Sequence, residues 1–290
     1  MSKFSFKQAT KAQSKLRLAI FGPAGAGKTF TALRLAMGIA EELNGKIAVI
    51  DTEFGTASKY ADRFQFDVLN LADPKIENMM NAIDAARDYD ILIIDSLTHS
   101  WKELLQEVNK LAKAKYRGNT WAAWSEGTPL QNNLVTAIQK FPSHLITTMR
   151  TKTEWITVAD NGKSRPVRVG LAPEQGKGIE YEFDMLMEIN PEHVINVIKD
   201  RTGKFQDRIV EYPDEEFGKE ILSWLNEGAP TNTIHIKEDL VKEGAKLGLT
   251  PDQIGEALRS AKLQFDPNVW DEMLTTLVNY TNKEVLTIIK

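Results

Sequence analysis

The most informative stretch of this 290-residue chain is Gly22-Pro23-Ala24-Gly25-Ala26-Gly27-Lys28-Thr29. It follows the apolar run 16–21 and precedes an apolar pattern of helical period over 28–43. The pattern G-x-x-x-x-G-K-[ST] between a strand and a helix is typical of a phosphate-binding loop. Its glycines let backbone N–H groups turn inward around phosphate oxygens, and the following helix adds the positive end of its dipole. The stretch therefore predicts a nucleotide site.

The motif also assigns roles to single side chains. Lys28 is expected to place its ammonium on the β- and γ-phosphates, and the hydroxyl of Thr29 is expected to coordinate Mg²⁺. ATP with Mg²⁺ is therefore the predicted ligand. The residues predicted to hold it are Gly22, Pro23, Ala24, Gly25, Ala26, Gly27, Lys28, Thr29 and Phe30.

Strands alternate with helices around this loop, which indicates an α/β fold with a mostly parallel central sheet. We expect strands at 16–21, 47–51, 66–71, 91–95 and 144–149, and helices at 28–43, 75–87, 97–114 and 125–140. The pattern changes after residue 150. There, the turn signal at 160–163 predicts a hairpin of strands 155–159 and 166–169, followed by strands at 185–189 and 194–199.

Two carboxylates follow predicted strands and suit ATP chemistry. Asp95 ends a run of four aliphatic residues and is the candidate second ligand of Mg²⁺, with helix capping as the alternative. Glu53 lies just past the strand 47–51, where its carboxylate can orient or deprotonate the attacking water.

The sequence at this point resembles the RecA-like ATPases, closest to a phage branch of ATP-dependent single-strand annealing or recombination proteins. The resemblance covers roughly 16–208 and includes Ile50-Asp51-Thr52-Glu53 and Ile93-Ile94-Asp95-Ser96, which are similar to the family's corresponding motifs. It implies a RecA-like P-loop core in which Glu53 activates water and Asp95 steadies Mg²⁺. It also implies that Tyr60 stacks on adenine, with a half-buried aromatic as the alternative.

The resemblance extends to residues outside the loop, with one departure. The family's Gln that senses the γ-phosphate aligns with Thr148, whose shorter hydroxyl can still bind phosphate or water, although the relay between ATP and DNA is then in doubt. Lys199 and Arg201 match cations that reach the ATP of the neighbouring subunit, which implies a site completed by assembly. A solvated pair at a strand end is the alternative for these two.

A basic segment follows the strand 144–149, where the family places its DNA-binding loop. Binding of single-stranded DNA needs cations along a groove and is helped by aromatic stacking. The residues predicted to bind DNA are Arg150, Lys152, Trp155, Lys163, Arg165 and Arg168. Trp155 has packing within the hairpin as its alternative role, and core packing is preferred for Trp121 and Trp124. Sequence-specific readout has no support, since no recognition-helix or zinc-finger signature is present.

Composition divides the chain into four parts. We predict a basic N-terminal segment 1–15, a RecA-like core 16–226, a linker 227–234 and a small acidic helical domain 235–290. The absence of cysteine excludes disulfides and thiolate chemistry. No window is apolar enough for a membrane span, and no signal-peptide pattern is present, so we expect a cytoplasmic protein of a bacterium or phage-infected host.

Together these patterns predict an ATPase, slow or DNA-stimulated, that binds single-stranded DNA and assembles into a ring or filament. Its C-terminal domain is a candidate site for a single-strand-binding protein, with a plain helical cap as the alternative. The main rival function is a RecA-like regulatory or replication-associated ATPase that acts on protein partners without binding DNA. A DNA-binding scaffold with negligible turnover and a small-molecule P-loop kinase are the other rivals.

Overall fold

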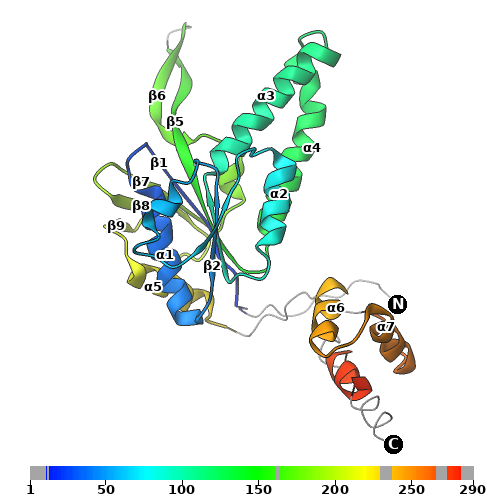
Figure 1. The fold of residues 1–290 in the computed structure, drawn as a ribbon. Coiled ribbons are helices and arrows are strands. Elements are labelled where there is room, and N and C mark those ends of the chain that lie inside the picture. Colours follow the sequence, from blue (N-terminus) through cyan, green and yellow to red (C-terminus); the bar gives the residue numbers. More distant parts are fainter. Residues whose placement is uncertain (1–10, 12, 161–162, 229–236, 266–272, 282–290) are drawn as a thin grey trace, which may run out of the picture. The chain divides into compact units, whose positions relative to one another are not determined.

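In the computed structural model the chain forms two compact units, 1–228 and 229–290 (Figure 1). The structure describes residues 11, 13–160, 163–228, 237–265 and 273–281, with side chains described for all of these except 154–169 and 237–239. The first unit contains the central sheet with its helices. The second is helical.

The central sheet has the strand order β3-β2-β4-β5-β1-β7-β8-β9. From β3 to β7 all neighbours are parallel, and β8 and β9 continue antiparallel. This confirms a mixed α/β fold with a mostly parallel sheet. The strands are β1 (Arg17–Gly22), β2 (Ile47–Asp51), β3 (Asp67–Asn70), β4 (Ile91–Asp95), β5 (His144–Asp160), β6 (Lys163–Pro173), β7 (Met185–Ile189), β8 (Val194–Asp200) and β9 (Ile209–Glu211).

Helices cover both faces of the sheet, because the side chains of its parallel strands alternate between two cores. Leu18 and Ile20 of β1 pack in a core with α1 (Lys28–Leu43) and α5 (Glu215–Leu225). Ala19 and Phe21 of the same strand pack in the opposite core, with α2 (Ile76–Ala85), α3 (Leu97–Lys115) and α4 (Thr120–Gln139). Figure 1 shows these two helical layers on either side of the strands.

Several elements differ from their predicted bounds. Strand β5 does not stop at 149 but runs on and pairs with β6, so the predicted hairpin is an extension of a central strand, as Figure 1 shows. Helix α4 begins at Thr120 because the Asn119 side chain accepts a hydrogen bond from the N–H of Ala122. Trp121 is consequently 87% exposed on this helix, contrary to the core role preferred for it. Trp124 does pack, stacked on Trp101 with ring centroids 5.6 Å apart.

Arg17, the first residue of β1, is not part of a basic surface. It is 7% exposed and donates to the carbonyls of Leu16, Gln139, Phe141 and Ser143. Burial lowers its pKa to about 10. The hydrogen bonds of Arg17 therefore hold the segment after α4 next to the start of β1.

The second unit has its own small core. Helices α6 (Lys237–Lys246) and α7 (Pro251–Ser260) contribute Leu240 and Leu258, and residues 273–281, also helical, contribute Met273. The expected helix start at Thr250-Pro251 is present, with Thr250 and Gln253 forming a capping box. The other expected start, at Asp266-Pro267, lies outside the described residues. Among the described helices, none is long and apolar enough to cross a membrane.

Candidate nucleotide site

The loop of residues 22–29 joins β1 to α1 with the backbone shape that its glycines permit. Gly25 and Gly27 have φ angles of 81° and 88°, in the left-handed region that glycine adopts without strain. Gly22 lies against β7, where an added Cβ would be 2.3 Å from the carbonyl oxygen of Ile189. Only glycine fits at this position, so β1 can end close against β7 where the loop begins.

Lys28, the first residue of α1, closes the loop. Its ammonium donates to the carbonyl of Pro23 at 2.8 Å. Burial lowers the pKa of Lys28, while Glu53 and Asp95 oppose that shift through their negative charges. The side chain is thus a cation held at the loop mouth, close to two carboxylates, where a phosphate can compete with the carbonyl for it.

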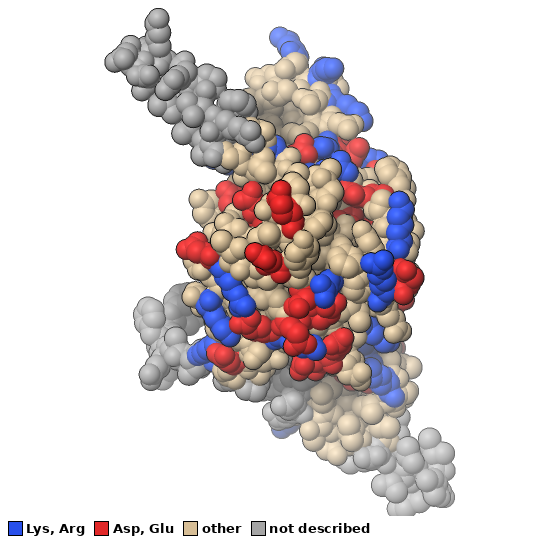
Figure 2. Space-filling model, turned by 90° about the vertical axis from the view of Figure 1, so that its left-hand side faces the viewer, with Lys and Arg blue, Asp and Glu red and all other residues tan. Residues whose placement is uncertain are grey.

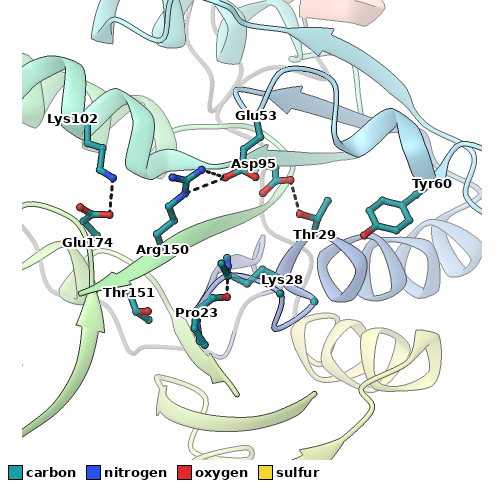
Figure 3. A pocket seen from close by; sticks show the side chains of 14 residues that line it. Pro23, Lys28, Thr29, Glu53, Tyr60, Asp95, Lys102, Arg150, Thr151 and Glu174 are labelled. Carbon is teal, nitrogen blue, oxygen red and sulfur yellow. Dashed lines mark hydrogen bonds and ion pairs between the residues drawn. The ribbon is translucent and has the colours of Figure 1, made fainter. Parts of the chain in front are cut away.

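The two predicted Mg²⁺ ligands meet. The hydroxyl of Thr29 donates to Asp95 Oδ2 at 2.7 Å (Figure 3). Asp95 is 1% exposed, and this burial raises the pKa of its carboxyl, an effect that hydrogen bonds from Thr148 and Thr29 oppose. A hydroxyl and a carboxylate at the edge of a cleft are the hard oxygen donors that Mg²⁺ prefers, so these residues fit the ion.

Thr148 occupies a different position from the one expected of a phosphate sensor. It is fully buried, and its hydroxyl donates to Asp95 Oδ1, on the carboxylate oxygen not used by Thr29. This side chain is not among those that line the cleft. Thr148 therefore supports the carboxylate of Asp95, and its expected contact with phosphate stays a prediction.

Glu53 is fixed just beyond β2 by the carboxylate of Asp51, which accepts from the N–H groups of Glu53 at 2.6 Å and Ala57 at 2.8 Å. Its own carboxylate accepts from Arg150, with Nη2 at 2.8 Å and Nε at 3.2 Å from the same oxygen, Oε1. Figure 3 shows this ion pair beside the loop. Arg150 was expected to bind DNA, but it lies in the nucleotide site.

One aromatic residue borders the nucleotide site on the side of α1, and a second packs against it. Tyr60, in the 3-10 helix Ala57–Tyr60, is half-buried and borders the open space. Phe30 supports it from behind, with ring centroids 5.5 Å apart. Phe30 also meets Phe64 at 5.4 Å, so it contributes packing under the site and does not border it.

These groups border a cleft of about 580 Å³, large enough for a nucleotide. Residues that the sequence analysis did not select also line it: Lys102, Thr151 and Glu174. Lys102 and Glu174 form an ion pair of 3.0 Å. They come from α3 and from the segment after β6, and no local motif marks them.

Another unselected residue lies next to the loop. His193 Nδ1 is 3.0 Å from the carbonyl oxygen of Ala26, and Ala26 is a buried residue. His193 follows β7, and its φ of 62° belongs to a turn before β8. It therefore supports the loop from the β7–β8 turn.

Lys199 and Arg201 lie away from the cleft. They sit at the end of β8, and Asp200 between them pairs with Met185 at the start of β7. The Lys199 ammonium donates to the carbonyls of Glu180 and Phe183, both at 2.7 Å, and Arg201 pairs with Asp184 at 3.2 Å. Their suggested role on a neighbouring subunit's ATP stays a prediction.

The remaining DNA-binding candidates lie on the hairpin. Lys152 is exposed and donates to the carbonyl of Gln175 at 3.3 Å. For the others the backbone register is known, with Trp155 opposite Arg168 and Arg165 opposite Val158. The side chains of Trp155, Lys163, Arg165 and Arg168 lie outside the described set, so their role stays a prediction.

Comparison with protein families relates the chain to a known domain. A family model described as an AAA domain matches residues 14–213. This range runs from before β1 to beyond β9 and includes every residue that lines the cleft. Comparison with curated proteins gave no match.

Proposed function

The chain belongs to this family of AAA domains, an AAA/P-loop ATPase-like family, and from that premise we propose that it is an ATP-dependent protein that binds single-stranded DNA. In this proposal it acts in annealing or recombination as RecA-like proteins do. ATP is bound with Mg²⁺ in the cleft, Thr29 and Asp95 hold the ion, and Glu53 orients the attacking water.

The observation that carries the DNA part is the course of strand β5. One continuous strand holds Thr148 under the Mg²⁺ carboxylate and Arg150 in the cleft, and then becomes the hairpin with β6. The hairpin bears Lys163, Arg165 and Arg168 in its second strand. A rigid strand that connects a nucleotide site to a basic arm is a direct way for ATP to affect DNA binding.

The charge of the body also favours the hairpin as the contact. Figure 2 shows the face with α1 and α5, where acidic and basic side chains are intermingled. Ion pairs account for part of this pattern, including Arg34 with Glu215 and Arg208 with Glu220. Cations neutralised by neighbouring acids release few counterions from DNA, so this face is a poor polyanion surface.

Assembly into a ring or filament is part of the proposal. Arg201 is more than half exposed in its pair with Asp184, and exposed ion pairs are weak enough to exchange for a stronger anionic partner. A neighbouring subunit's phosphate is such a partner. The second candidate function is an ATPase that acts on protein partners, and it is favoured by the exposed Trp121, a residue type enriched at protein interfaces.

The test is fluorescence anisotropy of a labelled single strand over a salt series, with and without ATP and Mg²⁺. The hairpin variant Lys163→Glu/Arg165→Glu/Arg168→Glu is compared with Lys110→Glu/Lys113→Glu on the exposed surface of α3. We expect wild-type binding that strengthens with ATP, and a salt slope that drops by about 2 in the hairpin variant, since each lost phosphate contact removes about 0.7.

Two results would decide against this proposal. Equal losses in the hairpin and α3 variants would mean that the hairpin is not the DNA contact. ATP binding without DNA binding under any condition would leave the ATPase that acts on protein partners.

A further inference from the structure

Arg150 combines a fixed backbone with a guanidinium in the cleft. Its N–H donates to the Thr98 hydroxyl at 2.9 Å, and its carbonyl accepts from the N–H of Glu174 at 2.7 Å. Its Cα is the register partner of Gly22, the first residue of the phosphate loop. The side chain therefore starts from a defined point immediately beside that loop.

The guanidinium is available to a ligand. It is 44% exposed, borders the cleft, and directs Nη2 and Nε to the single oxygen Oε1 of Glu53. An arginine can form two parallel bonds with a planar anion, and here two of its donors share one acceptor. The ion pair with Glu53 therefore uses less of the hydrogen-bonding capacity of the guanidinium than a phosphate could use.

Two cations, Lys28 and Arg150, lie close together at the opening of the phosphate loop. Burial is the main cause of the lowered pKa of Lys28, and the charge of Arg150 adds to it. Like charges held close together in a cleft oppose each other until an anion is bound between them. The third cation that borders the cleft, Lys102, is paired with Glu174.

We infer that Arg150 contacts the terminal phosphate of a bound nucleoside triphosphate and thereby makes the cleft select the triphosphate over the diphosphate. Without that phosphate, Arg150 rests on Glu53. When the phosphate is present, the guanidinium binds the phosphate. The carboxylate of Glu53 is then free to accept a hydrogen bond from water. This inference rests on nucleotide binding in the cleft and is independent of the DNA part of the proposed function.

The geometry links Arg150, Glu53 and the terminal phosphate. Glu53 can act on a water only if that water lies between its carboxylate and the phosphorus under attack. A guanidinium 2.8 Å from the same carboxylate is then within one side-chain movement of the phosphate. A diphosphate lacks the group in that place, so it leaves the pair of Arg150 and Glu53 intact.

The experiment measures affinities of mant-ATPγS and mant-ADP with Mg²⁺, in the absence of DNA. For Arg150→Ala we expect triphosphate affinity to fall about tenfold to a hundredfold, the range for hydrogen bonds to charged groups. Diphosphate affinity is expected to stay within about twofold. Arg150→Lys is expected to recover part of the loss, because it restores the charge without the bidentate geometry.

Three controls separate this role from others. Lys102→Ala removes another cation of the cleft and is expected to affect both nucleotides equally. Lys28→Ala is expected to weaken both strongly. Glu53→Gln removes the negative partner of Arg150 and is expected to keep or raise triphosphate affinity.

The inference is overturned if Arg150→Ala changes both affinities equally, or neither, or if Glu53→Gln causes the same selective loss. Urea unfolding of each variant identifies a loss of fold, and in that case Arg150→Gln, which keeps a hydrogen-bonding side chain, replaces Arg150→Ala. If the wild type binds neither nucleotide, the nucleotide site itself is refuted, which is a different outcome from a loss of selectivity.

Discussion

Thr148 and Asp95 form a buried hydrogen bond that links strand β5 to strand β4 beneath the cleft. The hydroxyl of Thr148 takes Asp95 Oδ1, so Oδ2 points to Thr29 and the cleft. Thr148 thus holds Oδ1 and Thr29 holds Oδ2, which is the oxygen that we expect to bind a metal ion. The orientation of Asp95 depends on a residue that contacts no ligand itself.

Removing the Thr148 hydroxyl should therefore weaken both stability and metal-dependent binding. Thr148→Val keeps the shape but leaves a buried carboxylate oxygen without its donor, which costs about 1–3 kcal/mol in the free energy of unfolding. Urea unfolding measures this loss, and ATP titration at varied Mg²⁺ concentration measures the rise in the Mg²⁺ requirement. Thr148→Ser restores the hydroxyl and should restore both. A Val variant with wild-type Mg²⁺ dependence would contradict the role given to Thr148.

Tyr60 should contribute to nucleotide affinity through the base and not through the phosphates. Its ring borders the cleft and is backed by Phe30. Loss of an aromatic platform under a base costs about 1–3 kcal/mol, so Tyr60→Ala should weaken ATP binding by about 5- to 150-fold. Competition with inorganic tripolyphosphate, which has no base, should be unchanged. Tyr60→Phe is the matched control and should bind ATP like the wild type.

The sequence predicts the residues of the cleft well where these residues follow the ends of strands. Asp95 ends β4, Glu53 follows β2 by two residues, and Thr29 begins α1 after the loop that follows β1. The carboxyl ends of these parallel strands share one edge of the sheet. Their meeting is therefore a consequence of the strand order. The pair of Lys102 and Glu174 joins α3 to the segment after β6, and its contact depends on tertiary packing that no motif encodes.

Arg150 and α5 illustrate two other limits. A basic residue at the start of a basic segment looks like a DNA contact, and only the register with Gly22 puts it beside the phosphate loop. Helix α5 was not predicted, although Asp214 precedes it and accepts from the N–H of Phe217 as an N-cap does. That signal was present in the sequence but is common to turns as well.

The packing of α1 on α5 should not tolerate a methyl group. A Cβ added at Gly38 would be 1.9 Å from the carbonyl oxygen of Glu215, and one at Gly218 would be 2.3 Å from that of Leu35. Because backbone atoms cannot move aside without separating the helices, Gly38→Ala should destabilise the fold by about 1–3 kcal/mol, despite the better helix propensity of alanine. Gly170→Ala is the control, since nothing lies within 4 Å of its added Cβ. Urea unfolding should show a change within about 0.5 kcal/mol for it.

His144 should make the fold sensitive to acid. It is 1% exposed, its Nδ1 accepts from the N–H of Leu16 at 3.2 Å, and burial lowers its pKa to about 3, with Lys15 and Arg17 adding to the shift. As the pH falls, His144 therefore binds a proton near pH 6.5 in the unfolded state but only near pH 3 in the folded state. The stabilisation by neutral His144 is full above pH 6.5 and is lost as the pH falls towards 3, by at most about 1.4 kcal/mol per pH unit.

His144→Asn provides the test of this pH dependence, because its Oδ1 can accept the same hydrogen bond but cannot be protonated in this range. Other carboxylates titrate between pH 3 and 6.5 in both proteins, so the quantity to follow is the difference in unfolding free energy between wild type and variant. That difference should be constant from pH 8 to 7 and should then shift steadily in favour of the variant as the pH is lowered. A difference that stays constant down to pH 4 would show that His144 accepts its proton without opening this corner of the sheet.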